Sequence, residues 1–143
     1  MANDEERTAA FERSSEHWLE WLHLELSRRG DTPRSRLLAL WDALEEWFSS
    51  EDFHGSFVAS AAGELRSEAE HPAHRVIAAH RLAVRQLLED LAKAAGALDP
   101  QGFAVQLQVL VEGAIVGALV DREPRIAEHA RELTEIALDA RTG

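Results

Sequence analysis

Phe103–Val120 reads FAVQLQVLVEGAIVGALV, an apolar run that three polar side chains interrupt. Gln106, Gln108 and Glu112 lie inside the run, and a helix that spans a bilayer would not normally carry three such groups. In a water-soluble protein, a helix that is apolar nearly all round has to be covered on both sides. The run therefore predicts a buried, central helix in a helical domain.

Helical signals fill the rest of the chain, whereas strand and hairpin signals are nearly absent. Gly30 follows a basic pair, as at the end of a helix, and Pro33 and Pro100 stand where helices begin. Six helices are expected, at about 4–29, 33–48, 56–67, 72–95, 100–120 and 126–140. No internal repeat or low-complexity linker divides them. The sequence thus predicts a single all-α domain over residues 1–143, built as a six-helix orthogonal bundle.

The composition narrows the function classes. Cysteine is absent, which excludes disulfides, thiolate metal sites and cysteine nucleophiles. The formal net charge of -11 repels phosphates and anionic lipid, so we expect no direct contact with nucleic acid or with a membrane. Asp4, Glu5 and Glu6 stand where a signal peptide would carry basic residues, and no apolar segment follows them, which predicts a cytoplasmic protein.

The central run also predicts a contact with a second copy of the chain. At about 100° per residue, Leu107, Val111 and Ile115 share one side, while Gly113 and Gly117 lie roughly opposite. Two glycines one turn apart let another helix approach closely. Paired with the last helix, this face would form half of an intermolecular four-helix bundle, whereas the alternative is that both helices complete one core. The predicted homodimer interface comprises Leu110, Gly113, Gly117, Val120, Ile126, Ala130 and Leu133.

Three stretches carry a resemblance to a known family: LALWDAL at 38–44, FHGSF at 53–57 continuing through AAGEL at 61–65, and LVEGA at 110–114. Together with the order and spacing of the helices, they resemble the C-terminal regulatory domain of TetR-family transcriptional regulators. The resemblance covers nearly the whole chain and implies ligand sensing, with dimerisation through the last two helices. Such regulators begin with a helix-turn-helix domain that this sequence lacks, so we expect either a truncated chain or a natural stand-alone regulatory domain.

The resemblance places a ligand among the first five helices. Aromatic residues suit such a pocket because they give broad apolar contact, and tryptophan adds one polar group. The alternative is that these side chains fill the core. The candidate ligand-binding residues are Trp18, Trp41, Phe57, Ser60, His80, Leu107 and Val111.

Glu112 is an unusual residue in an apolar run, because a lone buried carboxylate needs a partner or becomes neutral. We expect it to orient a ligand or to reach water at the helix edge, and a hydrogen bond across the dimer is a third interpretation.

A metal-dependent enzyme is the alternative of a different class. Glu-x-x-His pairs, the spacing that carboxylate-bridged di-iron bundles use, occur three times. Glu51/His54 lies in a predicted loop, and Glu68/His71 lies where Pro72 breaks the chain. Glu20/His23 lies inside a helix, but it shares its face with other glutamates. No phosphate-binding loop, nucleophile elbow or H-E-x-x-H motif occurs. We therefore expect no enzymatic activity, no metal and no cofactor; the three pairs are Glu20/His23, Glu51/His54 and Glu68/His71.

The resulting hypothesis is a dimeric, TetR-like regulatory domain that senses a small, mostly apolar effector. The alternatives are a structural homodimer with a filled core and no ligand, or a partner that hetero-dimerises with a full-length regulator and deprives it of one DNA-binding half.

Overall fold

The computed structural model describes residues 3–55 and 65–142 and forms five α-helices within these ranges. They are α1 (Asp4–Arg29), α2 (Pro33–Phe48), α4 (Ala73–Ala94), α5 (Pro100–Asp121) and α6 (Ile126–Arg141). The prediction of an all-α fold is confirmed. The helix expected at 56–67 falls mostly outside the described residues, and residues 65–67 at its end form a turn.

Local side-chain chemistry explains where the helices begin. Thr32 Oγ1 accepts a hydrogen bond from the Ser35 backbone N–H at 3.0 Å, and Asp99 Oδ1 accepts one from the Gly102 N–H at 3.1 Å. Both contacts satisfy amide groups that the first turn of a helix leaves unpaired. A proline follows each cap, at a position where its missing N–H costs nothing. The helix starts predicted at Pro33 and Pro100 are therefore confirmed.

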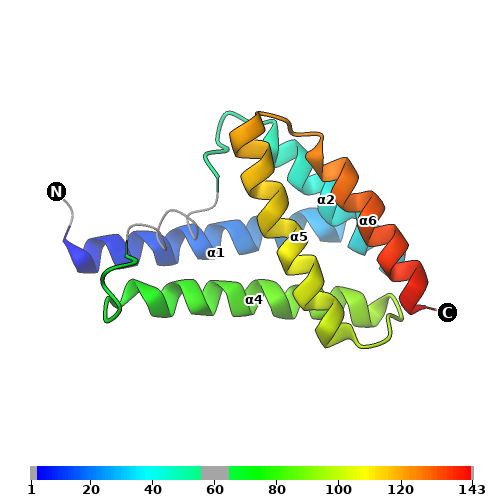
Figure 1. Ribbon diagram of the computed structural model, residues 1–143, viewed down its shortest axis with the longest axis horizontal. Coiled ribbons are helices and arrows are strands. Elements are labelled where there is room, and N and C mark those ends of the chain that lie inside the picture. Colours follow the sequence, from blue (N-terminus) through cyan, green and yellow to red (C-terminus); the bar gives the residue numbers. More distant parts are fainter. Residues whose placement is uncertain (1–2, 56–64, 143) are drawn as a thin grey trace.

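The helices form two connected pairs. Figure 1 shows α1 and α4 side by side along the long axis of the molecule, with α5 crossing them. In the second pair, α2 packs against α1 and α4, and α6 packs against α5. The largest fully buried side chains come from every helix and include Leu22, Leu40, Trp41, Leu88, Phe103, Leu107 and Leu138. One core therefore joins the five helices.

Helix α5 is long and apolar enough to span a membrane by length and composition alone. Here it packs against α4, α6 and α2. Its buried face contains Leu107, Val111 and Ile115, as predicted, and the opposite face is exposed at Val109 and Val116. Within one chain, the central helix is thus covered on one side and open on the other.

Candidate functional site

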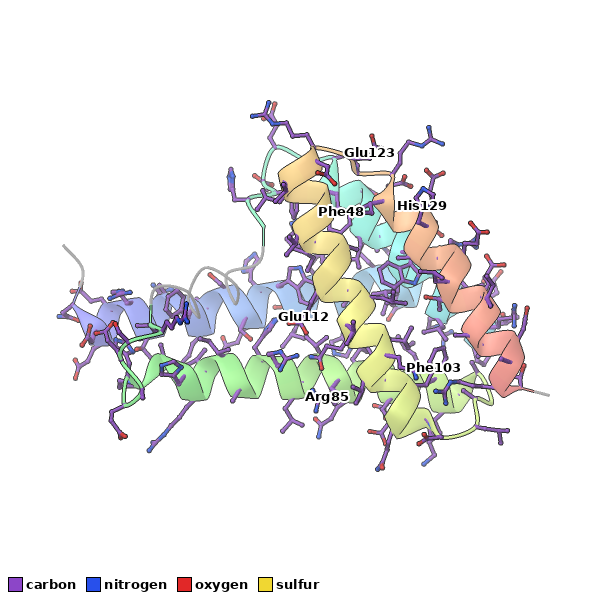
Figure 2. The ribbon with its side chains drawn as sticks, in the orientation of Figure 1. Phe48, Arg85, Phe103, Glu112, Glu123 and His129 are labelled. Atoms are coloured by element: carbon purple, nitrogen blue, oxygen red, sulfur yellow. The ribbon has the colours of Figure 1, made fainter. Side chains whose placement is uncertain are left out.

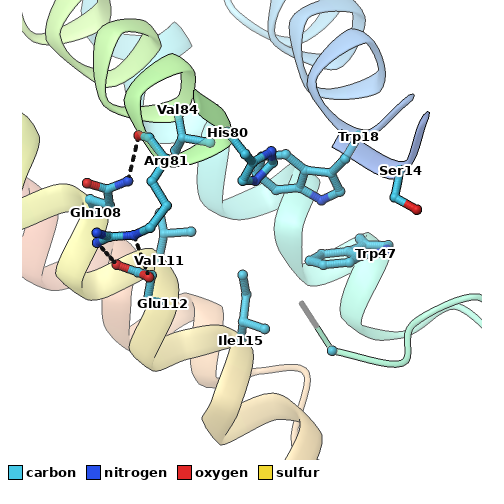
Figure 3. Close-up of a pocket in the computed structure, with 11 residues that line it drawn as sticks. Ser14, Trp18, Trp47, His80, Arg81, Val84, Gln108, Val111, Glu112 and Ile115 are labelled. Carbon is cyan, nitrogen blue, oxygen red and sulfur yellow. Dashed lines mark hydrogen bonds and ion pairs between the residues drawn. The ribbon is translucent and has the colours of Figure 1, made fainter. Parts of the chain in front are cut away.

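A cavity of about 210 Å³ lies where α1, α2, α4 and α5 meet (Figure 3). Each helix turns one face to the cavity, because residues three and four apart share one face of a helix. Four helices and one connection line the cavity. The lining residues are Ser14 and Trp18 on α1; Trp47 on α2; Gly55 in the connection after α2; His80, Arg81 and Val84 on α4; and Gln108, Val111, Glu112 and Ile115 on α5.

One side of the cavity is aromatic. The rings of Trp18 and Trp47 meet edge to face, with centroids 5.8 Å apart. Buried aliphatic side chains of Val84, Val111 and Ile115 continue this surface on α4 and α5. Such a surface favours apolar, and especially aromatic, molecules over strongly hydrated ones.

The other side of the cavity carries a closed ion pair (Figure 3). Arg81 binds both carboxylate oxygens of Glu112, with Nη2 2.6 Å from Oε1 and Nε 3.2 Å from Oε2. Both side chains are about two-fifths exposed, so the pair lies toward solvent. Glu112 stands in an apolar run, where a carboxylate needs a partner, and that partner is an arginine of the same chain.

Gln108 lies beside the ion pair and is buried. Its side-chain NH₂ donates to the Arg81 backbone carbonyl at 2.9 Å, and its Oε1 accepts from Arg85 Nε at 2.9 Å. Figure 2 shows Arg85 on α4 and Glu112 on α5, the two helices that these contacts join. The network holds α4 against α5 along this side of the cavity.

His80 is the cavity's buried titratable group, with 8% of its surface exposed. Its Nδ1 lies 2.7 Å from Ser15 Oγ in a hydrogen bond, and its ring lies against that of Trp18, with centroids 5.6 Å apart. Burial lowers the pKa of His80 from 6.5 to about 4, although the Glu112 carboxylate acts in the opposite direction. The imidazole is therefore uncharged at neutral pH.

Trp18, which lines the cavity, carries a buried hydrogen-bond donor. Its indole Nε1–H is buried and has no hydrogen-bond partner among the described residues. Buried donors are nearly always paired, so an unpaired one beside a cavity is noteworthy.

The structure brings three of the predicted ligand-binding residues together in the cavity wall: Trp18, His80 and Val111. Two others lie in the core instead, since Trp41 is 1% exposed and Leu107 is fully buried, and neither lines the cavity. Phe57 and Ser60 lie outside the described residues.

Sequence reasoning did not select Trp47, Arg81 or Gln108 as site residues. Gln108 had a usable signal, because it stands one turn before Glu112 and on the same helical face, in a run whose other polar side chain is Gln106. Trp47 and Arg81 carried no signal of this kind, because only the packing of α2 and α4 against α1 and α5 brings them to the cavity.

The predicted dimer residues occupy three kinds of place. Gly113, Val120 and Leu133 are exposed, and a Cβ at Gly113 would meet nothing within 4 Å. Gly117 packs against the Ile126 side chain of its own chain. The remaining two residues lie within the chain, where Leu110 is partly buried and Ala130 is buried.

In residues 3–55 and 65–142, no group of three or more His, Cys, Asp or Glu side chains gathers in a way that could hold a metal ion.

Comparison of the sequence with protein-family profiles and with curated proteins finds no match. Among solved structures, the fold is similar to that of a TetR-family transcriptional regulator from Streptomyces coelicolor, with a TM-score of 0.84. The two chains are 18% identical, and the match covers 97% of this chain and 73% of the other. This chain therefore has an all-α, TetR-like fold.

Proposed function

We propose that this chain is a ligand-sensing and dimerisation domain of a TetR-like transcriptional regulator, and that it binds a small, mostly apolar effector. The observation that carries the proposal is the cavity between two tryptophans and the buried face of α5. The similar fold of a transcriptional regulator supports it.

The cavity favours a ligand-binding domain over a homodimer with a filled core. Well-packed domains contain few voids larger than a water molecule. An apolar cavity of about 150 Å³ is enough to take up benzene in an engineered protein. The cavity here, at about 210 Å³, offers more room and has polar groups on one side. These are the features of a small-molecule site.

The open face of α5 supports the homodimer. Val109, Val116 and Val120 lie on this face with Gly113, and Leu133 and Ile136 extend an apolar surface onto α6. These five large side chains are between 51% and 72% exposed. An exposed apolar surface of this kind is typical of a protein–protein interface, and a second copy of the same surface would cover it with two-fold symmetry.

The cavity and the open apolar face of α5 suggest how ligand binding would affect the second copy of the chain. Helix α5 presents Val111 and Ile115 to the cavity, and it presents Gly113 and Val116 to solvent on the opposite face. A ligand that favours one position of α5 relative to α1 therefore favours one arrangement of the dimer. In a chain that also carries a DNA-binding domain, this shift would alter the spacing of the recognition helices.

Titration of the protein with a broad panel of apolar compounds tests ligand binding, with tryptophan fluorescence as the readout. We expect a saturable response, because Trp18 and Trp47 both line the cavity. Val84→Phe fills the cavity and should abolish the response. The matched control is Leu82→Phe, on the same helix but at an exposed position outside the cavity. A wild-type protein that responds to no compound would favour the filled-core alternative.

A further inference from the structure

The charged groups that line the described part of the cavity balance one another. Arg81 and Glu112 form a two-point ion pair, so each charge is neutralised by the other at the edge of the cavity. His80 adds no charge at neutral pH, because burial lowers its pKa to about 4. Arg85 does not line the cavity, and its Nε is bound by Gln108. An ionised ligand would therefore leave water without gaining an unpaired counter-charge, which is unfavourable.

A cation gains little from the aromatic side. Tryptophan faces attract cations, and the attraction grows when the cation is desolvated. The carboxylate that would complete such a site is Glu112, but Arg81 already holds both of its oxygens. The Arg81 guanidinium also carries the same charge as the incoming cation and would repel it.

One buried hydrogen-bond donor of a cavity residue lacks a partner among the described residues. The buried Nε1–H of Trp18 has no acceptor among the described residues, and leaving such a donor unpaired costs free energy. A ligand oxygen within hydrogen-bond distance would satisfy it. An indole N–H can only donate, so the matching ligand group has to be an acceptor.

We infer that the ligand of this cavity is an uncharged, largely aromatic or apolar molecule that carries a hydrogen-bond acceptor oxygen, and that the Trp18 indole N–H receives this oxygen. The inference rests on the proposed function and narrows the effector from mostly apolar molecules to one chemical class. It also makes Trp18 the residue that sets specificity, with Trp47, Val111 and Ile115 providing apolar contact.

Four naphthalene probes with substituents at one ring position test the inference by isothermal calorimetry on the full chain. Acetylnaphthalene carries an uncharged acceptor, isopropylnaphthalene has nearly the same shape without one, naphthoate is an anion and naphthylmethylammonium is a cation. We expect acetylnaphthalene to bind at least about tenfold more tightly than either ion. This order in the wild-type protein tests the charge preference without any substitution.

Two matched variants test the role of the indole N–H. Trp18→Phe keeps an aromatic ring but removes the donor, and it should weaken acetylnaphthalene by about tenfold and isopropylnaphthalene by about threefold or less. Trp21→Phe is the control, because Trp21 lies next to Trp18 in the aromatic cluster, with ring centroids 6.2 Å apart, but does not line the cavity. It should leave the affinities of both probes within about twofold.

The outcomes separate this inference from the proposed function. Tighter binding of naphthoate or of the ammonium probe would overturn the inference while confirming a ligand site. Equal losses for the acetyl and isopropyl probes in Trp18→Phe would overturn the role of the N–H. If none of the four probes binds, the inference is wrong, and the proposed function then stands or falls on the fluorescence panel. Should Trp18→Phe fail to fold, the wild-type order of the probes still decides the charge preference.

Discussion

Trp41 Nε1 donates a hydrogen bond to Thr134 Oγ1 at 2.8 Å, which joins α2 to α6 in the core. Thr134 Oγ1 in turn donates to the Ala130 carbonyl at 2.8 Å. Trp41 is 1% exposed and Thr134 is fully buried, so no water can replace either contact. This buried hydrogen bond explains why Trp41 belongs to the core and not to the cavity.

Thr134→Val should destabilise the protein by about 1–3 kcal/mol, because it keeps the shape of the side chain but leaves the buried Trp41 N–H without an acceptor. Urea unfolding of the wild type, Thr134→Val, Trp41→Phe and the double variant measures this as a double-mutant cycle. The two single losses should add to more than the loss in the double variant. Strict additivity would show that the hydrogen bond contributes nothing measurable.

Glu112→Gln should increase the affinity for naphthoate by about tenfold, because it leaves the Arg81 guanidinium without its counter-charge at the edge of the cavity. Calorimetry with naphthoate and acetylnaphthalene checks this, and the uncharged probe should change little. The double variant Arg81→Gln/Glu112→Gln is the control, since it restores charge balance and should bind naphthoate as weakly as the wild type. Because both side chains are partly exposed, we expect Glu112→Gln to change stability by about 1 kcal/mol or less.

Stability should decrease as the pH falls from about 6.5 toward 4, because of His80. Its folded-state pKa is lowered to about 4, so the unfolded chain takes up the proton first and is favoured by acid. The free energy of unfolding that is lost through His80 should reach about 2 kcal/mol at pH 5 and about 3 kcal/mol at most. Urea unfolding at pH 7 and pH 5 measures it.

His80→Gln should remove most of this loss between pH 7 and pH 5. The control is His17→Gln, which replaces an exposed histidine on α1 and should leave the pH dependence unchanged. A pH dependence that survives in His80→Gln would place its origin in other groups.

Val120→Glu combined with Ile136→Glu should convert a homodimer into a monomer, because it places charges in the exposed apolar face of α5 and α6. Analytical ultracentrifugation of the wild type and of the double variant measures the change in oligomeric state. Leu24→Glu is the matched control, since Leu24 is exposed on α1, and it should leave the dimer intact. A wild-type protein that is monomeric at high concentration would contradict the proposed dimer.

Local patterns predicted much of the fold. Helix α1 begins and ends at Asp4 and Arg29, as expected, and α5 begins after the Asp99 cap. Helical periodicity also identified the buried face of α5 at Leu107, Val111 and Ile115. These features depend on residues within a few positions of one another, so one sequence is enough to reveal them.

The partners of each face could be assigned only from the tertiary structure. Trp41 and Trp47 stand on the same helix, yet the first is buried against Thr134 on α6 and the second lies at the cavity beside Trp18 on α1. Gly113 and Gly117 stand one turn apart, yet Gly113 is open and Gly117 packs against Ile126. In both pairs the residue types are the same, and the difference comes from which helix covers each position.

The sequence by itself determined that this protein is an all-α bundle with a central apolar helix, because caps, prolines and helical periodicity act within one segment of chain. Only the tertiary structure decided which side chains meet around the cavity, how Arg81 neutralises Glu112 and that the Trp18 N–H has no acceptor among the described residues. Those contacts join residues that are distant in sequence, and the rotation and crossing of whole helices set them.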